Sequence, residues 1–290
     1  MFKGSAVALV APMMPDGQID FNTLNDLVEW HISSGTQALI VNGTTGESAT
    51  LSWAEQLKIT KAVVAQVQKR VPIIVGTGTN DTQKVIERHK DLETLGVDGF
   101  LIVAPYYNKP TQEGLKQHYQ KIAQNTSKPI LLYNVPGRTS CDLLPDTVAT
   151  LSRIPNIVGI KEASGDLERV KILKQRCGSA FRLYSGDDGS ALAFIQLGGD
   201  GVISVTANVF PKTMSKMCAH ALKGEIEKAK TENERLQKIH QLLFVESNPI
   251  PVKWALWEMG RIGPGIRLPL TSLSEPHQGA LSEALRSVGE

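Results

Sequence analysis

Residues 129–165 read PILLYNVPGRTSCDLLPDTVATLSRIPNIVGIKEASG and contain two short apolar runs separated by a longer mixed segment. The runs PILLYN (129–134) and NIVGIK (156–161) do not alternate between polar and apolar residues, and Pro, Asn or Gly bounds them. Such runs are typical of strands that are buried on both faces. The stretch therefore predicts a strand, a helical connection and a second strand.

The same pattern recurs outward from this stretch in both directions. Six further runs have the same length and bounds: SAVALV (5–10), ALIVN (38–42), PIIVG (72–76), GFLIVA (99–104), FRLYS (181–185) and GVISV (201–205). Helically spaced segments lie between them, and Ser52-x-x-Glu55, Asp81 and Asp166 are predicted helix starts. Eight alternating units predict an α/β fold of the (β/α)8 TIM-barrel type, with a doubly wound open sheet as the alternative.

The last part of the chain does not continue the alternation of strand-like and helical segments. Residues 225–290 contain no strand-like run, and helical patterns over 225–246 and 250–260 are followed by a Pro- and Gly-rich end. We therefore expect a catalytic barrel over residues 1–224 and a helical C-terminal extension over residues 225–290.

Composition excludes several classes of partner. The 31 Lys and Arg residues nearly balance 29 Asp and Glu residues along the 290-residue chain, and they are dispersed, so nucleic acid is not an expected partner. Pro12 and Pro15 interrupt the apolar start before it reaches the length of a signal peptide or membrane span. Three distant cysteines and histidines without HxxxH or HxH spacing predict neither a disulfide framework nor a metal site. A cytoplasmic protein is expected.

Polar residues at the carboxyl ends of the predicted strands are the candidates for chemistry, because barrel enzymes build their sites there. Lys161 ends the sixth strand, and burial would disfavour its ammonium form and free an amine that can attack a ketone. Tyr133 ends the fifth strand, where its hydroxyl could transfer protons. Arg138 follows in the next loop, and its planar guanidinium is suited to bind a carboxylate through two hydrogen bonds. Alternatively, Lys161 reaches water, Tyr133 is a core aromatic and Arg138 is a surface charge.

Two further loops carry candidate residues. GTTGES (43–48) combines turn-forming glycines with Thr44 and Thr45, which offer hydroxyl and N–H donors to a small carboxylate. The motif lacks the spacing of nucleotide-binding loops, and a plain turn before the next helix is the alternative. APYYNKP (104–110) contains Tyr106 and Tyr107, whose rings could pack at the rim, contact a second subunit or join a proton chain.

Taken together, GTTGES, PYYN, YNVPGR, GIKEASG, SGDD and GVISV resemble the pyruvate-dependent class I aldolase superfamily, in the order and at the strand ends found there. The resemblance covers essentially the whole chain, including NPIPVKWAL (248–256), and is strongest to the dihydrodipicolinate synthase family. It implies condensation of pyruvate with L-aspartate 4-semialdehyde in the diaminopimelate route to lysine. It implies no metal or organic cofactor.

The resemblance also implies roles for individual residues. Lys161 is similar to the Schiff-base lysine and Tyr133 to the proton donor and acceptor, while Thr44 and Tyr107 match the other members of a proton relay. Tyr107 comes from the neighbouring subunit of a homotetramer, a dimer of dimers, in this family. The positions matched to substrate binding are Thr45 and Arg138, for the carboxylates of pyruvate and the semialdehyde, and Gly186 and Ile203, which line the pyruvate site.

Members of the family that lysine inhibits bind it in a cleft between subunits, and the resemblance to this cleft is incomplete. The matching residues are Ser48, Ala49, Asn80 and Tyr106. Histidines are common where this chain has Trp53 and Gln56, and a glutamate where it has Lys84. Because Lys84 repels the ammonium groups of the ligand, we expect weak or absent feedback by lysine.

Two other functions remain open at the level of sequence. N-acetylneuraminate lyase and 2-keto-3-deoxy sugar acid aldolase use the same Schiff base, but a polyhydroxylated substrate is served better by hydroxyl and amide side chains than by Arg138. A non-catalytic barrel that senses a small acid or serves as a scaffold for assembly is the other possibility, and the presence of Lys161, Tyr133 and Arg138 argues against it.

Overall fold

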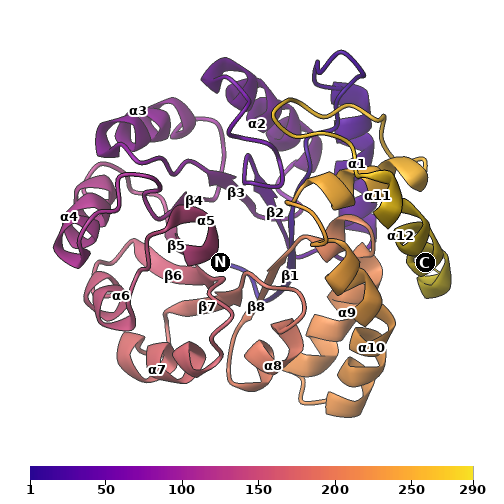
Figure 1. The fold of residues 1–290 in the computed structure, drawn as a ribbon. Coiled ribbons are helices and arrows are strands. Elements are labelled where there is room, and N and C mark those ends of the chain that lie inside the picture. Colours follow the sequence, from indigo (N-terminus) through magenta and orange to yellow (C-terminus); the bar gives the residue numbers. More distant parts are fainter. Residues whose placement is uncertain (290) are drawn as a thin grey trace.

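The computed structural model describes residues 1–289 and shows eight parallel strands closed into a barrel within a ring of helices (Figure 1). The strands are β1 (Gly4–Ala8), β2 (Ala38–Val41), β3 (Ile73–Gly76), β4 (Gly99–Val103), β5 (Ile130–Asn134), β6 (Ile157–Glu162), β7 (Arg182–Ser185) and β8 (Gly201–Ser204). Each strand pairs with its neighbours in sequence, and β8 pairs with β1, where Ala6 lies opposite Ile203. The predicted barrel is confirmed, and the open sheet is wrong.

Helices follow the strands, most of them on the outside of the barrel (Figure 1). They are α1 (Phe21–Ser33), α2 (Trp53–Val67), α3 (Thr82–Leu92), α4 (Gln112–Ala123), α5 (Pro136–Thr139), α6 (Pro145–Leu151), α7 (Glu168–Cys177), α8 (Ala191–Gln196), the 3₁₀ helix η1 (Thr206–Asn208) and α9 (Pro211–Leu222). The capping box of Ser52 and Glu55 starts α2, and the Asp81 carboxylate caps α3, as predicted. Asp166 lies one residue before the N-cap of α7, although its carboxylate still accepts the Glu168 N–H.

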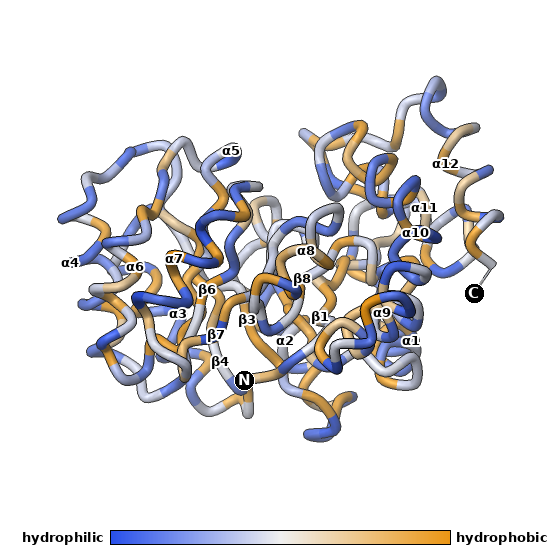
Figure 2. Tube along the Cα trace, turned by 90° about the horizontal axis from the view of Figure 1, so that it is seen from below, coloured by the Kyte–Doolittle hydropathy of each residue, from blue (hydrophilic) through white to orange (hydrophobic). Residues whose placement is uncertain are grey.

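Two apolar layers hold the barrel together. The outer layer fills the space between strands and helices, and Figure 2 shows the apolar segments concentrated along the strands and the inner sides of the helices. The inner layer fills the barrel itself and includes Ile40, Leu131 and Ile203. Phe2 stacks on Tyr184 inside the barrel, with ring centroids 4.3 Å apart, and the Tyr184 hydroxyl donates to the Phe2 carbonyl. A cavity lies at the carboxyl ends of the strands, where Gly76 and Val103 border it.

The C-terminal extension contains three helices: α10 (Ile226–Leu242), α11 (Ile250–Glu258) and α12 (Glu275–Val288). Helix α10 packs against α9 and α12, and the three helices lie on one side of the barrel (Figure 1). Helix α12 was not expected from the Pro- and Gly-rich end. Pro276 lies in its first turn, where proline is tolerated, and Leu281, Leu285 and Val288 form its buried face. The boundary near residue 224 stays a prediction. No helix in residues 1–289 is long and apolar enough to cross a bilayer.

Three of the four buried histidines in residues 1–289 make the fold measurably sensitive to acid. Burial lowers the pKa of His31 and His89 to about 3 and that of His118 to about 4. One ring nitrogen of each contacts a threonine hydroxyl, and the other has no partner.

We therefore expect stability to fall as the pH drops below about 6.5, the pKa of an unfolded histidine. Above this pH the three histidines are neutral in both the folded and the unfolded chain, and their contribution to the free energy of unfolding is fully present. Below it, they take up protons in the unfolded chain but not in the folded one, so this contribution is lost. The three residues together should reduce the free energy of unfolding by about 4 kcal/mol at pH 5.5 relative to neutral pH. Thermal unfolding at both pH values tests this. His89→Gln should weaken the dependence of stability on pH, and an unchanged dependence in this variant would contradict the assignment.

Candidate active site

Lys161 and Tyr133 lie side by side inside the barrel at the carboxyl end of the strands. The two residues are register partners in the β5–β6 ladder, so their side chains project from neighbouring strands to the same face. Both are buried, with exposed fractions of 6% and 8%. Lys161 Nζ lies 4.4 Å from the centroid of the Tyr133 ring. The structure thus brings together the amine and the phenol that the sequence singles out.

Gly186 makes room for the lysine side chain. A Cβ atom at this position would lie 2.6 Å from the Ala163 Cβ and 2.9 Å from the Lys161 Cε, distances that require one of these groups to move. The backbone of Gly186 is held in place, because its N–H donates to the Glu162 carbonyl. The glycine therefore fixes the path of the Lys161 stem across the cavity.

Gly186→Ala is expected to displace the Lys161 amine and to reduce kcat by about 100-fold, the size of effect that a displacement near 1 Å produces. Gly189→Ala is a matched control three residues later, because a Cβ there would come no closer than 3.8 Å to another residue. Initial rates and melting temperatures of both variants check the prediction. Equal kcat values for the two variants would contradict it.

The loop after β2 forms a tight turn. The N–H groups of Gly46 and Glu47 donate to the carbonyls of Gly43 and Thr44, which closes the turn. Within residues 1–289 the backbone N–H groups of Thr44 and Thr45 donate to no other group. Free N–H groups in a tight turn, with two hydroxyls beside them, suit a small carboxylate.

Arg138 lies in the short helix α5 at the mouth of the barrel. Its Nη2 donates to the Asn248 carbonyl over 3.1 Å, and no carboxylate of the described chain lies within 4 Å of it. Its guanidinium therefore keeps donors free for a carboxylate from outside the chain.

One cavity joins these groups. It has a volume of about 210 Å³, and its walls include Thr44, Thr45, Tyr133, Arg138, Lys161 and Gly186. A wider outer cavity of about 510 Å³ adjoins it and shares Thr44, Ser48, Arg88, Arg138 and Asn248. A small molecule can therefore reach Lys161 past Arg138.

Two residues matched by resemblance lie elsewhere in the described chain. Tyr107 is 89% exposed on the loop after β4, with a left-handed φ of 76°, and it does not line the cavity. Ile203 lies within the inner apolar layer, next to the strand β1, and is not part of the cavity wall. The proposed place of Tyr107 in a neighbouring subunit stays a prediction, because the structure contains one chain.

Several cavity residues were not singled out from the sequence. Asn248 lies in the segment 248–256 that carries part of the resemblance, and its side-chain Nδ2 donates to the Thr45 hydroxyl over 3.0 Å. Arg88, Asp187 and Phe244 also line the cavity. Asp187 belongs to the SGDD motif but was not assigned a role, and nothing in the local sequence of Arg88 or Phe244 distinguishes them from ordinary surface residues.

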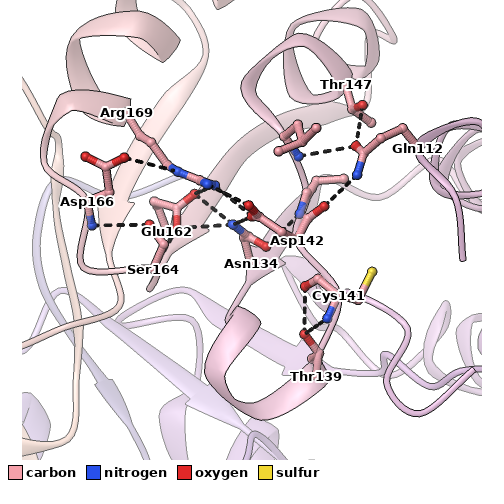
Figure 3. A network of polar contacts seen from close by, with 12 residues as sticks. Gln112, Asn134, Thr139, Cys141, Asp142, Thr147, Glu162, Ser164, Asp166 and Arg169 are labelled. Carbon is pink, nitrogen blue, oxygen red and sulfur yellow. Dashed lines mark hydrogen bonds and ion pairs between the residues drawn. The ribbon is translucent and has the colours of Figure 1, made fainter. Parts of the chain in front are cut away.

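Polar contacts join the ends of the two strands that carry Tyr133 and Lys161 (Figure 3). Asn134 and Glu162, which follow Tyr133 and Lys161, point out of the barrel, and Asn134 Nδ2 donates to the carboxylates of Glu162 and Asp142. Arg169 holds Asp142 through two hydrogen bonds of 2.7 and 2.6 Å. Burial raises the pKa of Glu162. The network joins the ends of β5 and β6 to the loop that follows α5.

The residues matched to the lysine cleft come together only in part. Ser48, Ala49 and Tyr106 line the outer cavity, whereas Asn80 and Lys84 do not. The Gln56 amide bonds the carbonyls of Ser48 and Leu51.

Trp53 occupies a second position at which this chain differs from the family members that lysine inhibits. Its Nε1 donates to Asp91 over 2.6 Å, and the Arg88 guanidinium lies 5.0 Å from the ring centroid. Because Lys84 and Arg88 are one turn apart on α3, the cleft region carries two cations on neighbouring turns.

Comparison with known proteins gives one consistent family. The model of the dihydrodipicolinate synthetase family matches residues 1–288. Proteins named 4-hydroxy-tetrahydrodipicolinate synthase from Stutzerimonas stutzeri and Pseudomonas aeruginosa are 53% and 52% identical over 289 residues, covering 100% of this chain and 99% of each relative.

The solved structures that are similar to this chain belong to the same family. A chloride-inhibited dihydrodipicolinate synthase from Acinetobacter baumannii, complexed with pyruvate, is 52% identical, with a TM-score of 0.98 over 100% of this chain and 99% of that chain. The enzyme from Thermotoga maritima is 43% identical, with a TM-score of 0.97 and the same coverage. With its barrel, its buried lysine and tyrosine and full-length matches of this strength, the chain belongs to the dihydrodipicolinate synthetase family.

Proposed function

We propose that the chain catalyses the 4-hydroxy-tetrahydrodipicolinate synthase reaction, the condensation of pyruvate with L-aspartate 4-semialdehyde, through a Schiff base on Lys161. The observation that carries this proposal is the buried Lys161 amine beside Tyr133, in a cavity also lined by Thr44 and Thr45, whose backbone N–H groups donate to no other group of residues 1–289. The reaction requires a nucleophilic amine, a group that transfers protons and a site that binds a carboxylate, and residues suited to each of these line the same cavity.

The first half of the reaction forms the enamine. The Lys161 amine attacks the pyruvate ketone carbon, and the resulting carbinolamine loses water to give an imine. Tyr133, with Thr44 and the Tyr107 of a neighbouring subunit as relay partners, supplies the proton that the leaving hydroxide needs. The pyruvate methyl group then loses a proton, and the protonated imine accepts the electron pair to form the enamine.

The second half uses the semialdehyde. The enamine carbon attacks the aldehyde carbon, and the new oxygen takes up a proton. The substrate amine then attacks the imine carbon, the six-membered ring closes, and the Lys161 amine leaves unchanged, so that one water is released over the whole reaction. Arg138 is suited to hold the carboxylate of the semialdehyde, because its guanidinium borders the cavity and faces no carboxylate of the described chain.

Turnover with alternative substrates tests this proposal. The purified protein should consume pyruvate and L-aspartate 4-semialdehyde together, and Arg138→Leu should raise the KM for the semialdehyde much more than that for pyruvate. Faster cleavage of N-acetylneuraminate or of a 2-keto-3-deoxy sugar acid would contradict the proposal in favour of those lyases.

We also propose that the active form is a homotetramer built as a dimer of dimers. Tyr106 and Tyr107 on the loop after β4 are exposed by 41% and 89%, which leaves two aromatic rings available for a subunit contact. Sedimentation equilibrium at several protein concentrations would measure the state, and a monomer at micromolar concentration would contradict it. The three free cysteines support a cytoplasmic location.

Lysine is expected to inhibit this enzyme weakly, with half-inhibition at or above about 1 mM, the range of weak binding. Lys84 and Arg88 repel the ammonium groups of the ligand, and the Gln56 amide is already bonded to its own loop. A titration of the initial rate with lysine measures this. Lys84→Glu should strengthen inhibition, and half-inhibition of the unmodified enzyme at micromolar lysine would contradict the expectation.

A further inference from the structure

A buried ion pair connects the C-terminal extension to the loop after β2. Lys253 on α11 bonds Glu47 through its Nζ, and the two side chains are only 3% and 1% exposed. The backbone N–H of Arg267 donates to the other carboxylate oxygen of Glu47 over 3.1 Å. The pair joins positions 206 residues apart in the sequence, and neither side chain takes part in the mechanism described above.

Glu47 also closes the turn that carries the free N–H groups. Its own N–H donates to the Thr44 carbonyl over 3.0 Å, and its φ of 52° lies in the left-handed region, which is unfavourable for a residue with a side chain. Its side chain extends to Lys253 and borders the outer cavity. A contact that holds this side chain therefore holds the turn of Thr44 and Thr45 in its strained shape.

Stability alone explains such a pair poorly. Removing two charges from water is unfavourable, and apolar residues of similar size often replace buried pairs without loss of stability. Burial lowers the pKa of Lys253, and the neighbouring Glu47 opposes this shift. A buried pair at a strained turn beside a substrate cavity is better explained by the geometry that it imposes.

Other residues of the extension contact the same region. Asn248 Nδ2 donates to the Thr45 hydroxyl, and the Asn248 carbonyl accepts from Arg138. The segment 248–253 therefore touches both the turn proposed to bind pyruvate and the arginine proposed to bind the semialdehyde.

We propose that Glu47 and Lys253 are positioning residues, which hold the Thr44–Thr45 turn in the shape that binds the pyruvate carboxylate. The C-terminal extension is then a working part of the active site. This inference rests on the proposed function, and it assigns the pair to the binding of pyruvate rather than to the chemistry at Lys161.

The double variant Glu47→Gln/Lys253→Met separates positioning from stability, because it removes both charges and leaves neither one buried alone. The readout is the fraction of protein that borohydride traps as a reduced pyruvate adduct, measured by intact mass over a range of pyruvate concentrations. We expect the half-saturating pyruvate concentration to rise about 10- to 100-fold, with the same adduct yield at saturation. The KM for the semialdehyde should change much less.

Lys230→Met is the matched control, since Lys230 forms an exposed ion pair with Glu227 on α10 of the same extension. It should leave the pyruvate dependence unchanged. If the double variant does not fold, Glu47→Asp gives the same test: it keeps the charge, shortens the reach to Lys253 by one methylene, and should also raise the half-saturating concentration.

A folded double variant, or a folded Glu47→Asp variant, with the half-saturating concentration of the unmodified enzyme would overturn the inference. The absence of any adduct in the unmodified enzyme is a different result, which would overturn the proposed function itself. An equal rise in the Lys230→Met control would also overturn the inference, because the effect would then not depend on the turn.

Discussion

Replacing Lys161 by arginine is expected to lower kcat/KM by on the order of 10⁵, the size of effect seen when an enzyme loses its nucleophile. Arginine keeps the positive charge and most of the length, but its guanidinium stays protonated and cannot form an imine with a ketone. Lys161 is buried, so water has little access to this position and cannot replace the lost amine as the nucleophile. Initial rates with pyruvate and L-aspartate 4-semialdehyde measure the loss.

Lys171→Arg is the control for this substitution. Lys171 lies on the exposed face of α7, where it pairs with Glu168 over 2.7 Å, and the same change there should leave the rate within a factor of two. Activity of Lys161→Arg within tenfold of the unmodified enzyme would contradict the role assigned to Lys161.

Tyr133→Phe is expected to lower kcat by about 10²- to 10⁴-fold, the range for loss of a general acid and base. The ring stays in place against Lys161 and the inner apolar layer, so the fold and the KM for pyruvate should change little. Only the hydroxyl that carries protons during formation and loss of the carbinolamine is removed. Steady-state rates and the rate of adduct trapping by borohydride should therefore fall together.

Tyr184→Phe provides a closely matched control. Tyr184 is the register partner of Lys161 on β7, and it is fully buried inside the same barrel. Its hydroxyl donates to the Phe2 carbonyl over 2.7 Å, away from the chemistry. The variant should lose about 1–3 kcal/mol of stability, because that carbonyl stays buried without a donor, and should keep most of its kcat. Equal loss of kcat in the two variants would contradict the assignment of Tyr133.

Local sequence determines much of this architecture. Most strands of the barrel are buried on both faces and appear as largely apolar runs, and the register of β5 and β6 then brings Tyr133 and Lys161 together. Helix α12 was missed because Pro276 suggests an irregular end, although a proline in the first turn is compatible with a helix.

Contacts between distant segments were not accessible from the sequence. The bond between Asn248 and Thr45 joins positions 203 residues apart, and neither residue belongs to a motif that predicts the other. The burial of Lys253 and its pairing with Glu47 could not be predicted from the segment 248–256, because a lysine on a helix normally reaches solvent. The space that Gly186 leaves for Lys161 likewise becomes visible only when both strands are in place.

Trapping of the Schiff base tests the central claim most directly. The protein is incubated with pyruvate, reduced with borohydride, digested and mapped by mass spectrometry. The account predicts one reduced pyruvate adduct per chain, located on Lys161 and absent when pyruvate or borohydride is omitted. An adduct on Lys253, the other buried lysine of the site region, or no adduct at all, would contradict it.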